Sequence, residues 1–417
     1  MEPSRSLWRA LGPGLITGAA DDDPSGIATY SQAGAQFGYS LTWTVLLTLP
    51  FMVAIQLVSA AIGWSTRRGL AHALARRLPS PVLFALVGSL LVANTFNIAA
   101  DLAAMGEGVR LLAGGPARLY AALLGTGCLV AEVVVPYHRY AGYLKYLTFV
   151  LFAYVAAAFS VHVPWAHVVR TTLFPAPRFE GGELLTTVAV FGTTISPYLF
   201  FWQASQEAEE ARLVHARGFR RGALGPGAFR HMARDTGIGM IVSNAVAFFI
   251  IVTTAATLHE AGQTHIETAA QAAEALRPIA GAFTFALFAA GIVGTGLLAV
   301  PVLAGSAAYA LAETLHLRGS LELPPARAIG FYAIIGAATL LGVALTFTGV
   351  DPIAMLFWSA VANGVVSVPI MAATMLAARG SSDHAQALPR WLVVLGWLAV
   401  LLMGGTVLLW LGSSFAS

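Results

Sequence analysis

Long apolar stretches, separated by short polar or basic segments, run along the whole 417-residue chain. A helix needs about 20 mostly apolar residues to cross a bilayer, and reading the runs against glycine, proline and charge predicts about eleven such helices. The predicted spans are residues 12–35, 41–65, 82–113, 117–136, 141–161, 184–206, 236–258, 279–312, 328–348, 352–378 and 390–412. The pattern therefore predicts an all-α integral membrane protein, with one transmembrane domain over residues 1–417 and no soluble domain.

The composition supports this fold class. Hydrophobic residues make up 57% of the chain and charged residues only 10%, with a mean hydropathy of +0.74, whereas soluble domains carry roughly 25% charged residues. The net charge of +3 comes from basic residues between the spans, so topology explains it and we expect no nucleic-acid partner. The single cysteine, Cys128, excludes an internal disulfide and a cysteine-based zinc site.

The basic residues also predict an orientation. With the N-terminus in the cytoplasm, the only ones of the 23 Lys and Arg residues in outer loops are Arg110, Arg118, Arg170, Arg178 and Arg277. An odd number of spans then places the C-terminus outside. We expect a multi-pass protein of the cell membrane, such as a bacterial inner membrane. Residues 207–235 form the main predicted cytoplasmic loop, and Glu132 and Glu207 are expected near helix ends.

The first span contains the sequence 18–26, GAADDDPSG, which places three carboxylates beside Pro24 inside an apolar segment. Each charge at the bilayer centre costs about 2.5 kcal/mol or more, and proline removes a helix hydrogen bond. Such a break is tolerated where it lines a cavity or binds a ligand. The alternative is a solvated helix end at the membrane edge, but apolar residues lie on both sides of the acids.

A second break is predicted in the sixth span, at residues 192–198, GTTISPY. Five spans separate the two breaks, and interrupted helices at matching places in two five-helix halves indicate a LeuT-like 5+5 inverted repeat with discontinuous helices 1 and 6. The halves are residues 10–161 and 184–378, and residues 390–412 form an extra helix. The freed carbonyls at such breaks favour a cation.

Further polar residues fall inside the spans. Asn97 and Asp101 share a face of the third span, with Glu107 further along, and they predict a proton or ion pathway. The alternative is hydrogen bonding between helices, since buried asparagine commonly joins spans. Asn363 raises the same choice, and the sequence Asn363-Gly364 with Pro369 beyond it predicts a local irregularity in the tenth span.

These motifs resemble those of the NRAMP family of divalent metal transporters. The resemblance is carried by residues 12–16, GPGLI, by 23–26, DPSG, by 34–39, GAQFGY, and by 56–60, QLVSA, and it extends over nearly the whole chain in the number and order of helices. In that family the first motif reads Asp-Pro-Gly-Asn and the sixth helix carries Met-Pro-His, and the Asp, Asn and Met contact a transition metal. The resemblance implies a metal site at the two breaks.

Several positions depart from the family pattern. Gly26 stands in the place of the Asn, Ser196 in the place of the Met and Tyr198 in the place of the His, while Asp101 matches the acid of the third helix and Ala104 replaces a second acid linked to proton transfer. Thioether sulfur favours softer metals, whereas oxygen ligands suit magnesium or manganese. The magnesium-transporting branch of the family likewise lacks the methionine.

The leading hypothesis is therefore a secondary transporter of a divalent cation, with magnesium and manganese ahead of iron and with possible coupling to protons. We expect no cofactor other than the transported ion, and no obligate protein partner besides the lipid bilayer. The expected metal ligands are Asp23, Ala20, Ile195, Ser196, Tyr198 and Asn363. The expected substrate cavity includes Asp22, Gly26 and Thr194, and the expected pathway includes Asp101, Asn97 and Glu107.

Three other functions are compatible with the sequence. The same fold could carry an organic cation or an amino acid, since Tyr30, Tyr198, Phe200 and Trp202 offer aromatic faces for a cation. An intramembrane hydrolase would need converging carboxylates, for which Asp23 and Asp101 are the only pair. A structural or receptor role without transport is the last alternative.

Overall fold

The computed structural model describes residues 13–135, 147–177, 181–216, 226–378 and 388–416, and this part of the chain is helical without any strand. The longer helices, in chain order, are α1 (Pro13–Asp21), α2 (Pro24–Phe37), α3 (Thr42–Thr66), α5 (Ser80–Ala113), α6 (Ala117–Val134), α8 (Phe152–Ser160), α9 (Trp165–Leu173), α10 (Gly181–Thr194), α11 (Pro197–Ala216), α12 (Pro226–Thr254), α15 (Thr284–Thr314), α16 (Ile329–Leu345), α17 (Pro352–Ala378) and α18 (Arg390–Ala416). Shorter helices are α4 (Leu70–Ala75), α13 (Ala269–Glu274) and α14 (Arg277–Ala280).

Each predicted span contains a helix, although the first part of the span 141–161 lies outside the described residues. Among the described residues, eight helical segments are long and apolar enough to cross a membrane, or nine if the bent pair Phe149–Ser160 and Trp165–Leu173 is one span. The two halves of the first span are individually short because the helix is broken between them. The fold class is confirmed, whereas the count of eleven stays a prediction.

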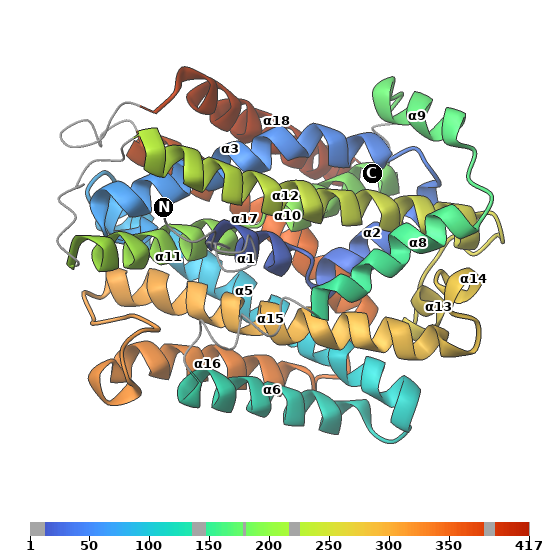
Figure 1. Cartoon of the computed structure of the whole chain (residues 1–417), viewed down its shortest axis with the longest axis horizontal. Helices are drawn as coiled ribbons and strands as arrows, with labels where there is room; N and C mark the ends of the chain where they lie inside the picture. The colour runs from blue at the N-terminus through green and yellow to red at the C-terminus, as the bar shows by residue number, and fades with distance from the viewer. Residues whose placement is uncertain (1–12, 136–146, 178–180, 217–225, 379–387, 417) are drawn as a thin grey trace, which may run out of the picture.

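The long helices run side by side along the longest axis of the molecule (Figure 1). Helix α5 packs against both α15 and α17 through the centre of the bundle, α6 and α16 lie together along one edge, and α3 packs against α18 at the other. Helices α9, α13 and α14 gather at one end of the bundle (Figure 1). This arrangement encloses α1 and α2.

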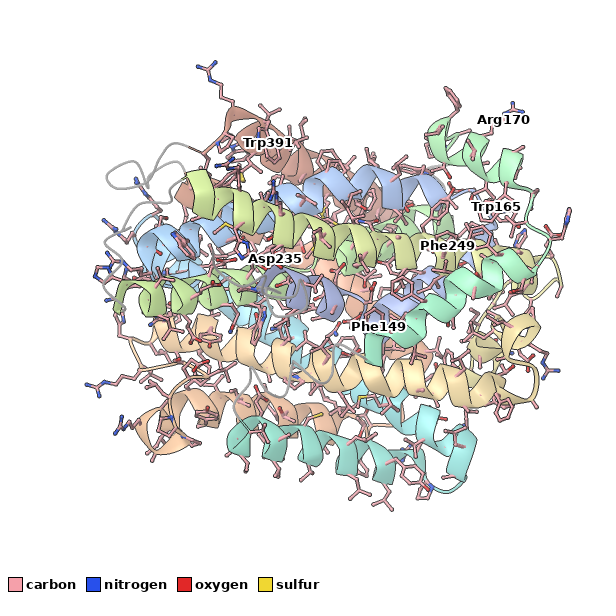
Figure 2. All side chains as sticks on the ribbon, in the orientation of Figure 1. Phe149, Trp165, Arg170, Asp235, Phe249 and Trp391 are labelled. Atoms are coloured by element: carbon pink, nitrogen blue, oxygen red, sulfur yellow. The ribbon has the colours of Figure 1, made fainter. Side chains whose placement is uncertain are left out.

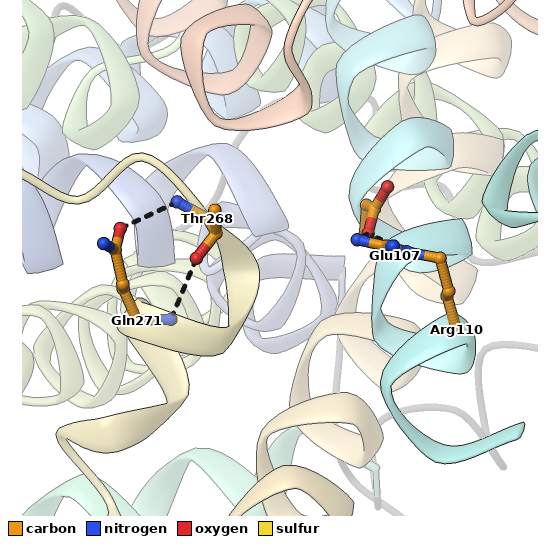
Figure 3. A network of polar contacts seen from close by, with 4 residues as sticks. All are labelled: Glu107, Arg110, Thr268 and Gln271. Atoms are coloured by element: carbon orange, nitrogen blue, oxygen red, sulfur yellow. Dashed lines mark hydrogen bonds and ion pairs between the residues drawn. The ribbon is translucent and has the colours of Figure 1, made fainter. Parts of the chain in front are cut away.

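The short helices at the ends were not predicted from the apolar pattern because they are too short and too polar. Helix α13 begins with a capping box, in which the Thr268 side chain accepts a hydrogen bond from the backbone N–H of Gln271 and the Gln271 side chain accepts one from the backbone N–H of Thr268 (Figure 3). This reciprocal pair satisfies two backbone groups that would otherwise lack partners.

Two predictions about helix shape were wrong. The expected loop from residue 207 is helical as far as Ala216, and Glu207 is buried within α11, where its carboxylate accepts a hydrogen bond from Gln203 at 3.1 Å. Glu132 does lie near a helix end, two residues before α6 ends at Val134, and its side chain is buried. A polar run with several acids looks like a loop in a membrane protein, but here one face of α11 continues to pack against α3 and α15.

The irregularity expected at Asn363-Gly364 is also absent, because α17 runs unbroken from Pro352 to Ala378. Gly364 instead allows α17 to approach α10 closely. A Cβ atom at Gly364 would lie 2.7 Å from the carbonyl oxygen of Val188 on α10, and a Cβ atom at Gly192 would collide with the backbone of Ala360 and Gly364. Backbone contact between α10 and α17 therefore requires glycine at both positions.

Candidate metal site at the broken helices

Both predicted helix breaks are present, and each forms where proline begins a new helix. Helix α1 ends at Asp21 and α2 begins at Pro24, while α10 ends at Thr194 and α11 begins at Pro197. A residue before proline favours extended backbone, and proline is well suited to the first position of a helix. Asp23 has this extended conformation and caps α2, since its Oδ1 accepts a hydrogen bond from the backbone N–H of Gly26 at 2.8 Å.

The second oxygen of Asp23 faces α5. Asn97 Nδ2 donates to Asp23 Oδ2 at 3.0 Å and lies 3.2 Å from Asp101 Oδ2, so one amide lies between two carboxylates. The side-chain oxygen of Asn97 in turn accepts a hydrogen bond from Asn363 Nδ2 on α17 at 3.1 Å. The sequence assigned these four residues to three separate spans, and the structure places them in one buried network.

Direct hydrogen bonds join the two breaks to each other. The Tyr198 hydroxyl donates to the carbonyl oxygen of Ala20 at 2.9 Å, and the hydroxyls of Tyr30 and Thr194 lie 3.0 Å apart. Tyr198 fills the space beside α1 with a fully buried ring. In this conformation the two unwound segments are therefore closed against each other.

Two expected ligands of the second break are engaged in other hydrogen bonds. The carbonyl oxygen of Ile195 accepts from the Ser367 hydroxyl of α17 at 2.6 Å, and the Ser196 hydroxyl donates back to carbonyls of its own helix, Gly192 at 2.8 Å and Thr193 at 2.9 Å. Each of these oxygens keeps a further lone pair that can accept a hydrogen bond or bind a cation.

Glu107 is not part of the network. It lies on α5 beyond Asp101 and forms an ion pair with Arg110 at 2.6 Å, one turn further along the same helix (Figure 3). Six residues of α-helix separate Glu107 from Asp101, which corresponds to about 9 Å along the axis. The predicted pathway therefore has Asn97 and Asp101 together and Glu107 well apart from them.

Sequence reasoning missed the serines that hold the site in place. Ser243 on α12 donates to Asp21 Oδ2 at 2.7 Å and lies 3.1 Å from Asp22 Oδ1, and Ser306 on α15 donates to the carbonyl of Tyr198 at 2.7 Å. A single serine inside an apolar helix carries little signal by itself. The spacing of four residues from Asp235 to Gly239 to Ser243 was the available sign of a polar face on α12.

The donor set is almost entirely oxygen. Within the described part of the chain, no three His, Cys, Asp or Glu side chains come together as a metal-binding group, so a metal at the breaks would combine Asp23 with carbonyl, hydroxyl and amide oxygens. Two oxygen atoms at the network, Asp101 Oδ1 and Asn363 Oδ1, are buried and have no hydrogen-bond partner among the described residues. Hard cations prefer such oxygen ligands.

The network lies between two cavities at opposite ends of α3. One, of about 720 Å³, is lined by residues that include Arg67, just after α3, and Glu209. The other, of about 700 Å³, is lined by residues that include Gln36, shortly before α3, and Asp351. Asp23 itself is only 2% exposed, so both cavities are closed off from it in this conformation.

Broken helices that meet at a buried polar site are typical of the LeuT-like fold. The structure of a manganese transporter of Eremococcus coleocola matches with a TM-score of 0.72 at 18% identity, covering 99% of this chain and 88% of that one. A Na⁺-coupled sialic acid symporter matches with a TM-score of 0.60 at 13% identity, covering 97% of this chain and 89% of that one. At these identities the similarity establishes the fold.

The sequence comparisons identify the family. The family model described as natural resistance-associated macrophage protein-like matches residues 14–412, so the chain belongs to the NRAMP family. A divalent metal cation transporter of Mycobacterium tuberculosis is 25% identical over 78% of this chain and 76% of its own length. A divalent metal cation transporter of Yersinia pestis is 28% identical over 71% of this chain and 70% of its own length.

Proposed function

We propose that this protein carries divalent metal cations across a membrane, with Asp23 as the central ligand. One observation carries the proposal: a buried carboxylate lies where two broken helices meet, and its hydrogen-bond partners Ser25, Gly26 and Asn97 are all neutral. A buried negative charge without a basic partner is costly, and a cation from solution would balance it. The names of the related transporters support the same cargo.

The remaining ligands are oxygen atoms around the two breaks. They are the carbonyls of Ala20 and Ile195 and the side-chain oxygens of Ser196 and Asn363, whereas the Tyr198 hydroxyl, also expected as a ligand, competes with the cation for the Ala20 carbonyl. With no sulfur among them, the site favours Mg²⁺ or Mn²⁺ over softer transition metals. Gly26 and Thr194, beside the breaks, would present only small groups to the cation.

Transport would proceed by alternating access. The cavities at the two ends of α3 are the inner and outer approaches, and the Tyr198 to Ala20 hydrogen bond closes the site between them. In this proposal, residues 10–161 and 184–378 are the two inverted halves, residues 390–412 are an extra helix, and a bundle containing the broken helices rocks around the fixed site.

The proposed orientation of the protein in the membrane rests on the arginines around one cavity. Arg67, Arg68, Arg212 and Arg318 all line the cavity of about 720 Å³, and the positive-inside rule assigns every one of them to the cytoplasm. We therefore propose that this cavity faces the cytoplasm of a cell whose inner membrane holds the protein, with the N-terminus on the same side and the C-terminus outside.

Uptake into proteoliposomes tests the proposal. We expect Mn²⁺ or Mg²⁺ to enter vesicles that contain the wild-type protein, and Asp23→Ala to abolish this flux. Glu274→Ala is the matched control, because that carboxylate is paired with Arg277 at the surface and should leave the flux unchanged. Absence of metal flux, together with thermal protection by an organic cation or amino acid, would instead support the organic-solute alternative.

A further inference from the structure

The two acids before Asp23 share one partner on a distant helix. Asp21 is the last residue of α1 and Asp22 follows it, and the Ser243 hydroxyl of α12 donates to Asp21 Oδ2 at 2.7 Å while lying 3.1 Å from Asp22 Oδ1. All three side chains are buried, with exposures of 5% or less. One hydroxyl therefore contacts two neighbouring carboxylates, and its single proton has the shorter hydrogen bond to Asp21.

The position of Ser243 is set by contacts along the whole of α1. At the start of α1, the backbone N–H of Gly14 donates to Asp235 Oδ2 at 2.7 Å, and Asp235 lies on α12 beside α1 (Figure 2). A Cβ atom at Gly14 would lie 2.5 Å from the backbone nitrogen of Thr236. The start of α1 is thus in backbone contact with α12 at Thr236.

The same close approach continues one turn later. A Cβ atom at Gly18 would collide with the backbone of Gly239, and one at Gly239 would lie 2.5 Å from the carbonyl oxygen of Gly14. On α12 the contacts come from residues 235, 239 and 243, a repeat of four on one face, and on the other side they come from residues 14 and 18 of α1 and from the two acids at its end. This register brings Ser243 to the acids.

The hydrogen bonds of Ser243 leave one carboxylate oxygen without a partner. Asp21 Oδ1 is buried and has no hydrogen-bond partner among the described residues. An unsatisfied buried carboxylate oxygen is costly and points to a ligand that completes it. Asp21 lies two residues from Asp23 at the same break, where a cation would approach.

We propose that Ser243 is a positioning residue, which holds the Asp21 carboxylate so that Oδ1 is available as a further ligand to the transported cation. The inference rests on the proposed metal transport and adds a residue that acts on the cation through Asp21.

A double-mutant cycle tests the proposal, with Mn²⁺ titrated into the full-length protein in lipid nanodiscs. Ser243→Ala should weaken Mn²⁺ binding by about ten- to a hundredfold, as expected for loss of a hydrogen bond to a charged group. Because Ser243 acts through Asp21, the same substitution should change affinity less than about threefold in an Asp21→Ala background. Equal weakening in both backgrounds, or none in either, would overturn the proposal.

Two further variants separate positioning from general packing. Ser243→Thr keeps the hydroxyl and should restore binding to within about threefold of wild type. Thr254→Val removes another buried hydroxyl of α12, one that donates only to carbonyls of its own helix at 2.8 and 3.1 Å, and should leave Mn²⁺ affinity unchanged. Loss of affinity in Thr254→Val as large as in Ser243→Ala would contradict a specific role for Ser243.

Thermal unfolding without metal keeps the two proposals distinguishable. If the wild-type protein binds no Mn²⁺, the proposed metal transport fails, but the contact between Ser243 and Asp21 can still be measured. The decrease in Tm caused by Ser243→Ala should then be smaller in the Asp21→Ala background than in the wild type. Equal decreases would show that the hydroxyl does not act on Asp21.

Discussion

The Tyr198 hydroxyl donates a hydrogen bond to the carbonyl oxygen of Ala20 at 2.9 Å and so joins the two helix breaks. This bond occupies an oxygen that the proposed cation would use. Tyr198→Phe should release it at little change in volume, lowering the unfolding free energy by about 1 kcal/mol. It should also tighten Mn²⁺ binding by roughly three- to tenfold, because the Tyr198 hydroxyl then no longer competes with the cation for the carbonyl of Ala20.

Tyr332→Phe is the matched control for this substitution. Tyr332 also donates to a carbonyl, that of Leu323 at 3.1 Å, but lies on α16 far from the breaks in sequence. It should lower stability without changing Mn²⁺ affinity in a titration. Weaker Mn²⁺ binding by Tyr198→Phe would mean that the hydroxyl serves as a ligand rather than as a competitor.

The amide of Asn97 separates two buried carboxylates, and its removal should be severe. Asn97→Ala leaves Asp23 and Asp101 without this donor, and hydrogen bonds to charged groups contribute about 1.5–3 kcal/mol each. We expect a loss of about 3 kcal/mol in stability and at least a tenfold loss in Mn²⁺ affinity, measured by chemical unfolding and by titration.

Asn94→Ala provides the comparison on the same helix. Asn94 donates to the carbonyl of Leu303 at 2.9 Å, a neutral partner on α15, and its loss should cost about 1 kcal/mol with unchanged metal affinity. If Asn94→Ala and Asn97→Ala have the same Mn²⁺ affinity in the titration, Asn97 does not act on the metal. It would then serve only to hydrogen-bond helices to one another, which was the alternative interpretation.

Proton movement distinguishes Asp101 from Glu107. Asp101 is fully buried beside Asn97, whereas Glu107 is paired with Arg110 towards the helix end. We expect Asp101→Asn to abolish any internal acidification that accompanies Mn²⁺ uptake, and Glu107→Gln to leave it at the wild-type level. A pH-sensitive dye inside proteoliposomes measures both, and unchanged acidification in Asp101→Asn would remove that residue from the pathway.

The close contact between α10 and α17 predicts a stability difference between two glycines. Gly192→Ala would drive a methyl group into the backbone of α17 and should destabilise the protein by about 3 kcal/mol. Among the described residues, no atom of a neighbouring element lies within 4 Å of the place that a Cβ atom at Gly237 of α12 would take. Gly237→Ala should therefore be neutral or stabilising by up to about 1 kcal/mol. Thermal unfolding of both variants checks the difference, and equal shifts in Tm would contradict the packing at α17.

Both helix breaks could be predicted because proline, glycine and carboxylates inside an apolar run are rarely tolerated unless the helix is interrupted there. Asp23, Asn97 and Asp101 could be selected for a similar reason, since buried polar groups in a membrane need partners. Their assembly into one network could not be read from the sequence, because Asn97 lies 74 residues from Asp23 and 266 from Asn363.

The misinterpreted residues have sequences that fit two structures equally well. Asn363-Gly364 is typical of an irregular helix, yet Gly364 is required by the neighbouring backbone of α10. Glu207 lies in a run of acids typical of a loop, yet packing against other helices keeps α11 regular as far as Ala216. In both cases the deciding contact comes from a helix distant in the sequence.

Anomalous diffraction from crystals of the full-length protein grown with Mn²⁺ tests the central claim most directly. We expect one strong peak within about 2.0–2.6 Å of a carboxylate oxygen of Asp23, between the breaks at residues 21–24 and 194–197, and its loss in Asp23→Ala. A peak confined to the cavities at the bundle ends, or one that persists in Asp23→Ala, would contradict the assignment of Asp23 as the central metal ligand.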